Sequence, residues 1–451
     1  MKFINSDELI DKLNTNSNYR YDFSKLLKYN PQLEKYVIKN DKINDRIIYD
    51  FSKNENNIEF TQSVLKLYFN LDIKIENDRL CPRIPNRLKY VDLMYTLLKT
   101  TELNTDSDDY IGLDIGTGHV CIYSLLLYQK YKIKSIGTDI DVKSIELAQT
   151  NLFLNNIKDE DIALIINEDS NDLNMYHSLF ERIVKEKNSY IGFTVCNPPF
   201  YESQLDLDTA KSNKTNNPNT LDLVGTDLEL FTKGGELEFI GRLIDDSCSI
   251  NLKTDKFKWF SSMINKYSNL PKVVEHLETK KIWNFGIFEL SFKDFESKPV
   301  YHSSTSRWVV YWSFQNFIPP YQISRLKHSN LKFVNPPLSE FVIVNKTDKS
   351  FILKELALLN YIKLTASEDK KYVRFEAPDM VWSRSYRRSL KGNKRQKISN
   401  EESQVLTPKE PTVIDIIITD SSIKIHWRYG ASYKIYESFT SWLKRKSDEN
   451  K

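Results

Sequence analysis

The sequence predicts an α/β protein with a doubly wound, mostly parallel sheet, preceded by a helical N-terminal extension and followed by a small α+β domain. Strand-like and helix-like segments alternate between residues 110 and 196, at the spacing that is typical of parallel strands joined by helices. Apolar residues recur at helical spacing over much of residues 1–100. A chain of 451 residues exceeds what one hydrophobic core usually serves, so two or three domains are expected.

The composition is that of a folded protein without a strong charge bias. Hydrophobic residues make up 40% and charged residues 28%, which excludes an intrinsically disordered chain. The net charge is only +3, so any nucleic-acid surface must come from how the charges are distributed. The four cysteines form no CxxC pair, which argues against a disulfide framework or a structural zinc site. We expect a soluble intracellular protein, because the chain shows no signal peptide and no apolar run of the ~20 residues that a bilayer requires.

The N-terminal extension is assigned to residues 1–100. Pro82 and Pro85 predict an extended segment over residues 81–87, because proline disfavours a helical conformation at the residue before it. Helices are predicted over residues 60–68 and 88–100.

The central domain is assigned to residues 101–318. Its helices carry apolar residues on one face, as Ile145, Ala148 and Leu152 do. Residues 205–219 carry Ser, Asn and Lys without periodicity, which predicts a mobile loop. Strands are predicted over residues 111–116, 133–139, 162–166, 190–196, 283–292 and 307–314, and helices over residues 122–131, 142–155 and 237–244.

The third domain is assigned to residues 335–451, after a linker that two proline pairs bracket. Strands are predicted over residues 412–419 and 423–429, and an amphipathic helix follows them. A basic, Ser-rich loop at about residues 389–411 interrupts this domain. The pattern predicts a small α+β fold.

Polar motifs follow three successive strands of the predicted sheet. The first strand ends in Asp114-Ile115-Gly116-Thr117-Gly118, where the glycines let the backbone approach a ligand, although the third glycine of the dinucleotide fingerprint is missing. The second ends in Thr138-Asp139, whose carboxylate can accept both hydroxyls of a ribose. The third is followed by Ser170, near the place of an adenine. Each motif alone fits a glycine turn or a solvated acid, but together they predict a nucleoside cofactor.

The fourth strand ends in the most specific motif, Asn197-Pro198-Pro199-Phe200. An amine on an sp2 carbon is a poor nucleophile, because its lone pair is delocalised into the ring. Two acceptors, the Asn197 side-chain oxygen and the Pro198 carbonyl, can bind its hydrogens and direct the lone pair towards an electrophile. Phe200 can stack on a base swung out of its strand. The competing interpretation is a Pro-Pro kink with a core Phe, but open sheets bind ligands at this end of their strands.

Four segments carry a resemblance to a known family: Arg83-Ile84-Pro85-Asn86-Arg87-Leu88-Lys89-Tyr90, Asp114-Ile115-Gly116-Thr117-Gly118, Cys196-Asn197-Pro198-Pro199-Phe200 and Gly234-Gly235-Glu236-Leu237-Glu238-Phe239. They resemble the Rossmann-like class I S-adenosylmethionine-dependent methyltransferases, and within these the methyltransferase-like-sixteen family, over roughly residues 20–315. That family includes the bacterial 23S rRNA adenine-N6 methyltransferase. The resemblance implies S-adenosylmethionine as cofactor, methylation of adenosine N6 in U6 small nuclear RNA or another structured hairpin, a nuclear location and a C-terminal RNA-binding domain.

The resemblance also implies roles for individual residues. Arg87 and Gly116 would contact the cofactor, with the guanidinium of Arg87 binding its methionine carboxylate, and Asp139 would hold the ribose. Ser170 stands where the family has a Thr, and Asn197 would lie between cofactor and substrate. The predicted cofactor site comprises Arg87, Asp114, Gly116, Gly118, Thr138, Asp139, Ser170 and Asn197, and the predicted catalytic residues are Asn197, Pro198, Pro199 and Phe200.

Two departures from the family bear on the RNA target. The stretch before the last strand reads His302-Ser303-Ser304-Thr305-Ser306-Arg307-Trp308, without the family's glycine. The loop after the catalytic motif is Arg-rich in vertebrate members but offers only Lys211 and Lys214 here.

A basic stretch without acids runs from Val381 to Ile398 and interleaves aromatic with charged residues, which favours contact with RNA phosphates. A solvated loop or a nuclear-import signal is the alternative. The predicted RNA contacts are Lys211, Lys214, Arg387, Arg388, Lys391, Lys394 and Arg395, and Trp382 is included as a ring that could stack. The six histidines lack metal-ligand spacing, so no metal is expected, and His119 is predicted to be a solvated loop residue.

The sequence therefore predicts an RNA adenosine-N6 methyltransferase, with neither a membrane nor a metal involved. Its partner, a structured RNA, is expected to dock across the helical N-terminal extension and the C-terminal domain. No signal indicates an oligomeric state. Three alternatives stay open: an rRNA adenine-N6 methyltransferase, a protein glutamine methyltransferase, and an RNA-binding or assembly factor that uses the fold as a scaffold.

Overall fold

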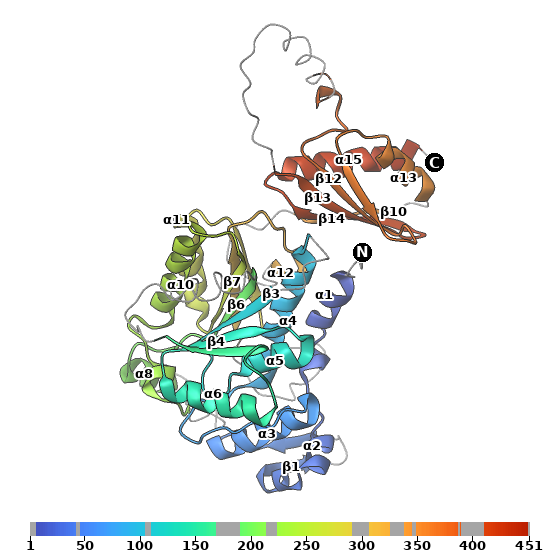
Figure 1. The fold of residues 1–451 in the computed structure, drawn as a ribbon. Coiled ribbons are helices and arrows are strands. Elements are labelled where there is room, and N and C mark those ends of the chain that lie inside the picture. The colour runs from blue at the N-terminus through green and yellow to red at the C-terminus, as the bar shows by residue number, and fades with distance from the viewer. Residues whose placement is uncertain are drawn as a thin grey trace.

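The structure is a computed structural model that describes residues 6–41, 46–103, 110–167, 190–212, 223–290, 306–324, 338–344, 349–386, 388 and 410–449. Its central element is a seven-stranded sheet of order β5-β4-β3-β6-β7-β9-β8 (Figure 1). All neighbouring strands are parallel except those that pair with β9, which is antiparallel to both of its neighbours. The strands are β3 (Tyr110–Ile115), β4 (Ser135–Asp139), β5 (Ile162–Ile166), β6 (Tyr190–Cys196), β7 (Phe257–Ile264), β8 (Asn284–Glu289) and β9 (Trp308–Ser313). The predicted α/β fold is confirmed.

Helices cover both faces of this sheet and give it two hydrophobic cores. One core joins Phe193 and Val195 of β6 to α4 (Ile84–Thr101), α5 (Ile122–Tyr131) and α6 (Val142–Leu154). The other joins Ile191 of the same strand to α10 (Gly235–Asn251) and α11 (Leu270–Thr279). Consecutive residues Val195 and Cys196 face opposite cores, as a strand buried on both sides requires, and a register shift between β3 and β6 puts Ile191 on the side opposite to Phe193.

The N-terminal region is helical, as predicted, but it also contains a short hairpin that the sequence did not predict. Tyr49, on the second hairpin strand, packs its ring 5.9 Å from that of Phe23 and 5.4 Å from that of Phe60, so the hairpin closes an aromatic cluster. The elements are α1 (Ser6–Asn14), η1 (Asn16–Tyr19), α2 (Phe23–Tyr29), η2 (Pro31–Tyr36), β1 (Val37–Asp41), β2 (Arg46–Tyr49) and α3 (Asn54–Phe69).

Two local predictions were wrong. Residues 81–87 are not extended throughout, because α4 already begins at Ile84 with Pro85 in its first turn, where the missing N–H costs no helical hydrogen bond. The first part of the predicted loop 205–219 is the helix α8 (Gln204–Ser212), and residues 213–219 lie outside the described part of the chain. The short helices α9 (Asp227–Leu230) and α12 (Tyr321–Ser324) complete this region.

The C-terminal part forms a five-stranded antiparallel sheet of order β10-β14-β13-β12-β11. Phe375 and Phe439 stack 4.6 Å apart in its core, and the ring of Trp382 lies 5.1 Å from that of Phe439. Trp382 is therefore a core residue, and its predicted availability to a nucleobase was wrong. The elements are β10 (Glu340–Val344), α13 (Lys349–Ala357), β11 (Lys363–Ala366), β12 (Tyr372–Ala377), β13 (Thr412–Ile418), β14 (Ser422–Tyr429) and α15 (Tyr433–Glu449).

The face of this sheet that is turned away from its own core docks on the C-terminal end of α4. Asp415 accepts hydrogen bonds from Nε of Arg374 (2.7 Å) and from Nε of Arg428 (2.9 Å), and all three side chains are buried. The guanidinium of Arg374 also donates to the carbonyl oxygen of Leu103, and that of Arg428 to the carbonyl oxygen of Thr100. Both oxygens lie at the C-terminal end of α4, where the helix dipole favours a cation. Figure 1 shows the C-terminal sheet at the end of the molecule opposite α2 and α3.

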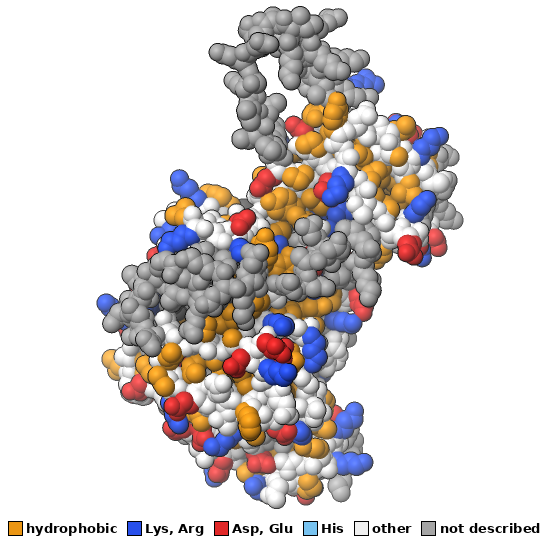
Figure 2. Space-filling view, in the orientation of Figure 1, with side chains coloured by type: hydrophobic (Ala, Val, Ile, Leu, Met, Phe, Trp, Pro, Cys, Tyr) orange, Lys and Arg blue, Asp and Glu red, His pale blue; other side chains and the backbone are white. Residues whose placement is uncertain are grey.

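The visible surface carries mixed charge. Figure 2 shows Lys and Arg side chains interspersed with Asp and Glu, in line with the net charge of +3. Among the described residues, no helix has the length and apolar character needed to cross a membrane.

We expect Asp415→Ala to lower the free energy of unfolding by about 3–5 kcal/mol, because it leaves two buried guanidiniums without their carboxylate. Urea denaturation measures the change, with Asp420→Ala in the exposed turn between β13 and β14 as the matched control. A loss no larger than that of the control would show that Asp415 does not hold this junction.

Candidate active site

The predicted cofactor motifs meet at the carboxyl ends of β3 and β4. The backbone N–H of Gly118 donates to Oδ2 of Asp139 (2.9 Å), and that of Thr117 donates to the carbonyl oxygen of Thr138 (2.8 Å). Because both strands run in the same direction, their ends lie at one edge of the sheet, where open α/β sheets bind ligands. The structure therefore joins the glycine loop to the acid of the next strand.

The two glycines of the loop leave room for a ligand. Gly116 and Gly118 adopt left-handed φ angles of +67° and +65°, which side chains rarely tolerate. Apart from the glycines themselves and their chain neighbours, no heavy atom of the described residues lies within 4 Å of the position where a Cβ of either residue would stand. The loop is therefore shaped for the close approach of another molecule.

Asp139 can accept further hydrogen bonds beside those it already makes. Its Oδ1 binds the N–H of Asp141 (3.0 Å) and its Oδ2 that of Gly118, which leaves a lone pair on each oxygen for ribose hydroxyls. Burial raises the pKa of this carboxyl against the effect of those N–H donors. Thr138 directs its hydroxyl to the carbonyl oxygen of Asp114 (3.5 Å), so its side chain supports the loop from inside.

Asp114 lies beneath the loop and is fully buried. Its Oδ2 accepts hydrogen bonds from the hydroxyls of Thr117 (2.7 Å) and Ser124 (3.3 Å), while Oδ1 has no partner among the described residues. Burial raises the pKa of Asp114 to about 7, although the two hydroxyls act in the opposite direction. A carboxyl that titrates near neutrality thus lies directly under the glycine loop.

Arg87 connects the N-terminal end of α4 to the catalytic motif. Its Nη1 donates to Oδ1 of Asn197 (2.9 Å) and to the hydroxyl of Tyr123 (2.8 Å), and the side chain is buried. No carboxylate within the described ranges lies at ion-pair distance from this guanidinium. A buried cation without a carboxylate partner fits an anionic group on a ligand.

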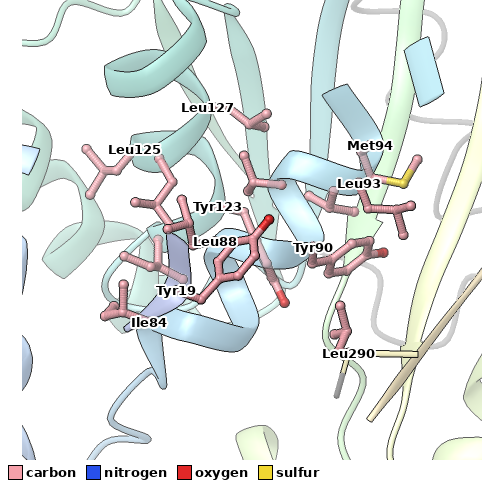
Figure 3. Close-up of a cluster of buried hydrophobic side chains, with 14 of the residues drawn as sticks. Tyr19, Ile84, Leu88, Tyr90, Leu93, Met94, Tyr123, Leu125, Leu127 and Leu290 are labelled. Carbon is pink, nitrogen blue, oxygen red and sulfur yellow. The ribbon is translucent and has the colours of Figure 1, made fainter. Parts of the chain in front are cut away.

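The turn that begins at Asn197 is fixed from below by Tyr90 of α4. The Tyr90 hydroxyl accepts a hydrogen bond from the N–H of Cys196 (3.3 Å) and lies 2.7 Å from the hydroxyl of Ser261 on β7. Figure 3 shows Tyr90 and Tyr123 among the apolar side chains of α4 and α5. Helix α4 therefore holds both the last residue of β6 and the side chain of Asn197.

The Gly-Gly-Glu motif at the start of α10 supports the chain that follows the turn. Gly235 adopts a left-handed φ of +62°, and its Cα faces the backbone of Tyr201 and Glu202, where a Cβ would stand 3.5 Å from the backbone nitrogen of Glu202. Buried Glu236 accepts hydrogen bonds from the N–H of Asn265 (2.6 Å) and from Nδ2 of Asn269 (2.9 Å). Phe200 is only half-buried and outside the hydrophobic cores, unlike the core Phe of the alternative interpretation.

Sequence reasoning missed two arginines near the site. Burial, together with the charges of Arg83 and Arg87, lowers the pKa of Arg307 to about 10. Three guanidiniums thus lie close enough to repel one another. Arg307 stands directly before β9, within the stretch that departs from the family pattern. That departure is the sequence signal that could have identified Arg307 as a site residue.

The prediction for His119 was wrong, because its side chain is only 2% exposed. Its Nδ1 lies 3.5 Å from Oε1 of Glu229, a residue that sequence reasoning did not single out.

The structure leaves several other predicted site residues undescribed. Ser170, Lys214, Arg387, Lys391, Lys394 and Arg395 lie outside the described residues, as does the side chain of Lys211, whereas Arg388 is described and exposed. Their roles stay predictions.

One group of side chains among the described residues has metal-ligand character: Asp7, Glu340 and His426, at the junction of α1 and the C-terminal sheet. Lys424 binds the carboxylate of Asp7 there. This group belongs to the domain junction and contributes nothing to the site at the glycine loop.

Three features follow the strands of this sheet: the glycine loop after β3, the acid after β4 and the Asn-Pro-Pro-Phe turn after β6. The sheet itself is parallel except for β9. Together these features define a methyltransferase. A family model described as RNA methyltransferase matches residues 11–316, and the chain belongs to this family. The protein is therefore an RNA methyltransferase that uses S-adenosylmethionine, as predicted.

The relatives include enzymes that act on two kinds of RNA. The chain is 29% identical to a "U6 small nuclear RNA (adenine-(43)-N(6))-methyltransferase" of Schizosaccharomyces pombe, over 86% of this chain and 92% of that protein. It is 33% identical to a "Ribosomal RNA large subunit methyltransferase F" of Christiangramia forsetii, over 58% of this chain and 88% of that protein. The fold matches the hMettl16 catalytic domain in complex with a MAT2A 3'UTR hairpin, with a TM-score of 0.54 and 26% identity, over 65% of this chain and 91% of that one.

We expect Asp114→Asn to flatten the dependence of stability on pH. Between the ordinary pKa near 3.8 and the folded pKa near 7, the folded wild type holds a proton that the unfolded chain has released, so its stability falls as pH rises. Relative to the variant, the wild type should lose about 2–3 kcal/mol between pH 5 and pH 7.

Urea denaturation at several pH values, without added cofactor, measures this loss. Asp159→Asn, on an exposed turn, serves as the control and should follow the wild type. Parallel profiles for wild type and Asp114→Asn would contradict a raised pKa at Asp114.

Proposed function

We propose that this protein methylates N6 of an adenosine swung out of a structured RNA, with U6 small nuclear RNA as the substrate and the nucleus as the place of action. The observation that carries the proposal is the turn at Asn197, which begins directly after β6 beside the open glycine loop after β3, and whose side-chain amide oxygen is held by Arg87. The names of two relatives, "U6 small nuclear RNA (adenine-(43)-N(6))-methyltransferase" and "RNA N(6)-adenosine-methyltransferase METTL16", support the choice of adenine.

The residues around the loop fit S-adenosylmethionine. Gly116 and Gly118 would lie against it, Asp139 would accept the ribose hydroxyls, and Arg87 would bind the methionine carboxylate. When bound there, the cofactor supplies an electrophilic methyl group on sulfur. The open space at both glycines and the lack of a carboxylate partner for Arg87 in the described residues are what this assignment depends on.

The catalytic turn would orient the amine of the base. Oδ1 of Asn197 has two lone pairs, of which Arg87 uses one, so the other can accept an amine hydrogen. The carbonyl of Pro198 would accept the second hydrogen, and Phe200 would stack on the ring. The reaction requires no general base, because the methylated amine is acidic enough to lose its proton to water. Orientation of the reacting groups would provide most of the rate enhancement.

The arginines beside the site would contact RNA. Arg83 and Arg307 lie near Arg87, and their mutual repulsion is relieved when an anion enters. A phosphate of the strand that carries the adenosine provides such an anion. Arg83 directly precedes α4 and Arg307 directly precedes β9, and both therefore lie at the same edge of the sheet as the catalytic turn.

Ribosomal RNA is a second candidate substrate, because the bacterial relative has the higher identity, 33% against 29%. The match to that relative extends over 58% of this chain, whereas the match to the U6 enzyme extends over 86%. The greater coverage favours U6 RNA. A methylation assay with labelled cofactor on fractionated cellular RNA and on protein decides between them. Label at adenosine N6 of U6 RNA is expected, and label confined to protein would overturn the proposal.

We expect Asn197→Ala to reduce methyl transfer by at least about a hundredfold while RNA binding survives, because the amine loses an acceptor that orients it. Turnover with a labelled cofactor and RNA binding by gel shift measure the two effects. Asn251→Ala, at the exposed end of α10, is the control. A near-native rate in the Asn197 variant would refute the amine-orienting role.

For the basic stretch, we expect neutralising Arg387, Arg388, Lys394 and Arg395 together to weaken RNA binding and to reduce the slope of log affinity against log salt by about 3–4, as the loss of phosphate contacts requires. Binding titrations at several salt concentrations measure the slope. An unchanged slope would assign these residues to something other than phosphate contact.

A further inference from the structure

Glu229 of α9 lies where three segments of the proposed site meet. Its carboxylate is within 3.5 Å of Nδ1 of His119 and within 3.4 Å of the N–H of Leu80, and it accepts a hydrogen bond from the N–H of Thr226 (2.8 Å). The side chains of Glu229 and His119 are only 14% and 2% exposed. A buried carboxylate needs such donors, because burial alone disfavours its charge.

The first of these segments is the glycine loop. His119 directly follows Gly118, and its carbonyl oxygen accepts a hydrogen bond from Nδ2 of Asn151 on α6 (3.2 Å). The backbone of His119 is therefore fixed from one side, and its ring reaches Glu229 on the other. Any shift of Glu229 would act on the loop whose open space is shaped for the cofactor.

The second segment leads into α4. Leu80 stands three residues before Arg83, and the preceding Arg79 is anchored by Asp141 (2.6 Å) at the start of α6. Glu229 thus contacts the chain immediately before the helix that carries Arg87.

The third segment backs the catalytic turn. The carbonyl oxygen of Leu230, next to Glu229, accepts a hydrogen bond from the N–H of Tyr201 (3.0 Å), and the N–H of Thr232 donates to the carbonyl oxygen of Tyr201 (2.9 Å). Tyr201 directly follows Phe200. The position of α9 therefore determines where the end of the Asn-Pro-Pro-Phe turn lies.

We propose that Glu229 and His119 form a positioning pair that couples the cofactor loop to the catalytic turn, holding both at the separation that methyl transfer requires. Neither residue touches the reacting atoms. The proposal rests on the proposed function for the identity of the reaction, but the coupling itself is a property of the contacts among α9, the glycine loop and the segment before α4.

The charge of Glu229 matters for this role. Burial acts to raise its pKa, but the contact with His119 and the N–H groups of Thr226 and Leu80 prevail and lower it, so Glu229 is an anion at neutral pH. Glutamine in its place would turn an amide group towards N–H donors and lose half of the acceptors. The glycine loop and the segment before α4 would then lose their common partner on α9, without any change in side-chain size.

The test compares wild type with Glu229→Gln, His119→Ala, His119→Asn and the double variant His119→Ala/Glu229→Gln. We expect the first two variants to raise the KM for S-adenosylmethionine and to lower kcat, each about tenfold, with unchanged RNA affinity. His119→Asn should recover most of the loss, because its Nδ2 stands near the place of the histidine Nδ1. The double variant should be no worse than Glu229→Gln alone, since the two residues act through one contact.

Three further measurements keep the result interpretable. Thermal unfolding checks that each variant is folded, and if Glu229→Gln is not, the comparison of His119→Ala with His119→Asn decides. Glu146→Gln, on the exposed face of α6, is the matched control and should behave as wild type. Calorimetric binding of S-adenosylmethionine without RNA reports the cofactor loop independently of turnover.

Additive losses in the double variant, a His119→Asn variant as impaired as His119→Ala, or unchanged cofactor affinity and kcat in Glu229→Gln would each overturn the pairing. A wild-type protein that binds the cofactor but methylates no RNA would instead contradict the proposed function. The cofactor affinities of the variants would still decide whether the pair exists, so the two failures are distinct.

Discussion

The contact between the guanidinium of Arg87 and the amide oxygen of Asn197 joins the two halves of the site. One end of it belongs to the helix before the sheet, and the other belongs to the turn after β6. Because Arg87 can only donate hydrogen bonds, the atom of Asn197 that faces it is the oxygen, which fixes the side chain with an acceptor directed into the site. The same buried cation lacks a carboxylate among the described residues, so it also favours an anionic ligand beside the turn.

Helix α4 carries much of what positions this contact. Its first turn carries Arg87, and Tyr90 one turn later binds the end of β6 and Ser261. At its other end, the carbonyl oxygen of Thr100 accepts a hydrogen bond from Arg428, and that of Leu103, just beyond the helix, accepts one from Arg374. The helix thus runs from the catalytic turn to the C-terminal sheet. The close packing of α4 against the parallel sheet leaves little room for it to shift, since protein interiors transmit strain and do not absorb it.

Most strands of the central sheet and the polar residues at their ends were predictable from sequence, because short apolar segments mark the buried strands and parallel strands bring their carboxyl ends together. Strand β7, between β6 and β9, was not predicted. Asp139 and Asn197 were found in this way. Arg307 and the burial of His119 were not, because burial and the approach of distant charges depend on tertiary packing. Likewise, Trp382 was predicted to be available for stacking because basic residues surround it in the sequence. Its ring is buried in the core of the C-terminal sheet, which the neighbouring residues do not indicate.

The most direct test of the account is a crystal structure of the protein with S-adenosylhomocysteine and a U6-derived hairpin. The account predicts an adenosine turned out of its strand, with N6 about 3 Å from both Oδ1 of Asn197 and the carbonyl oxygen of Pro198, and with the ring of Phe200 against the base. A structure in which the cofactor product lies away from Gly116 and Gly118, or in which no base can reach Asn197, would contradict it.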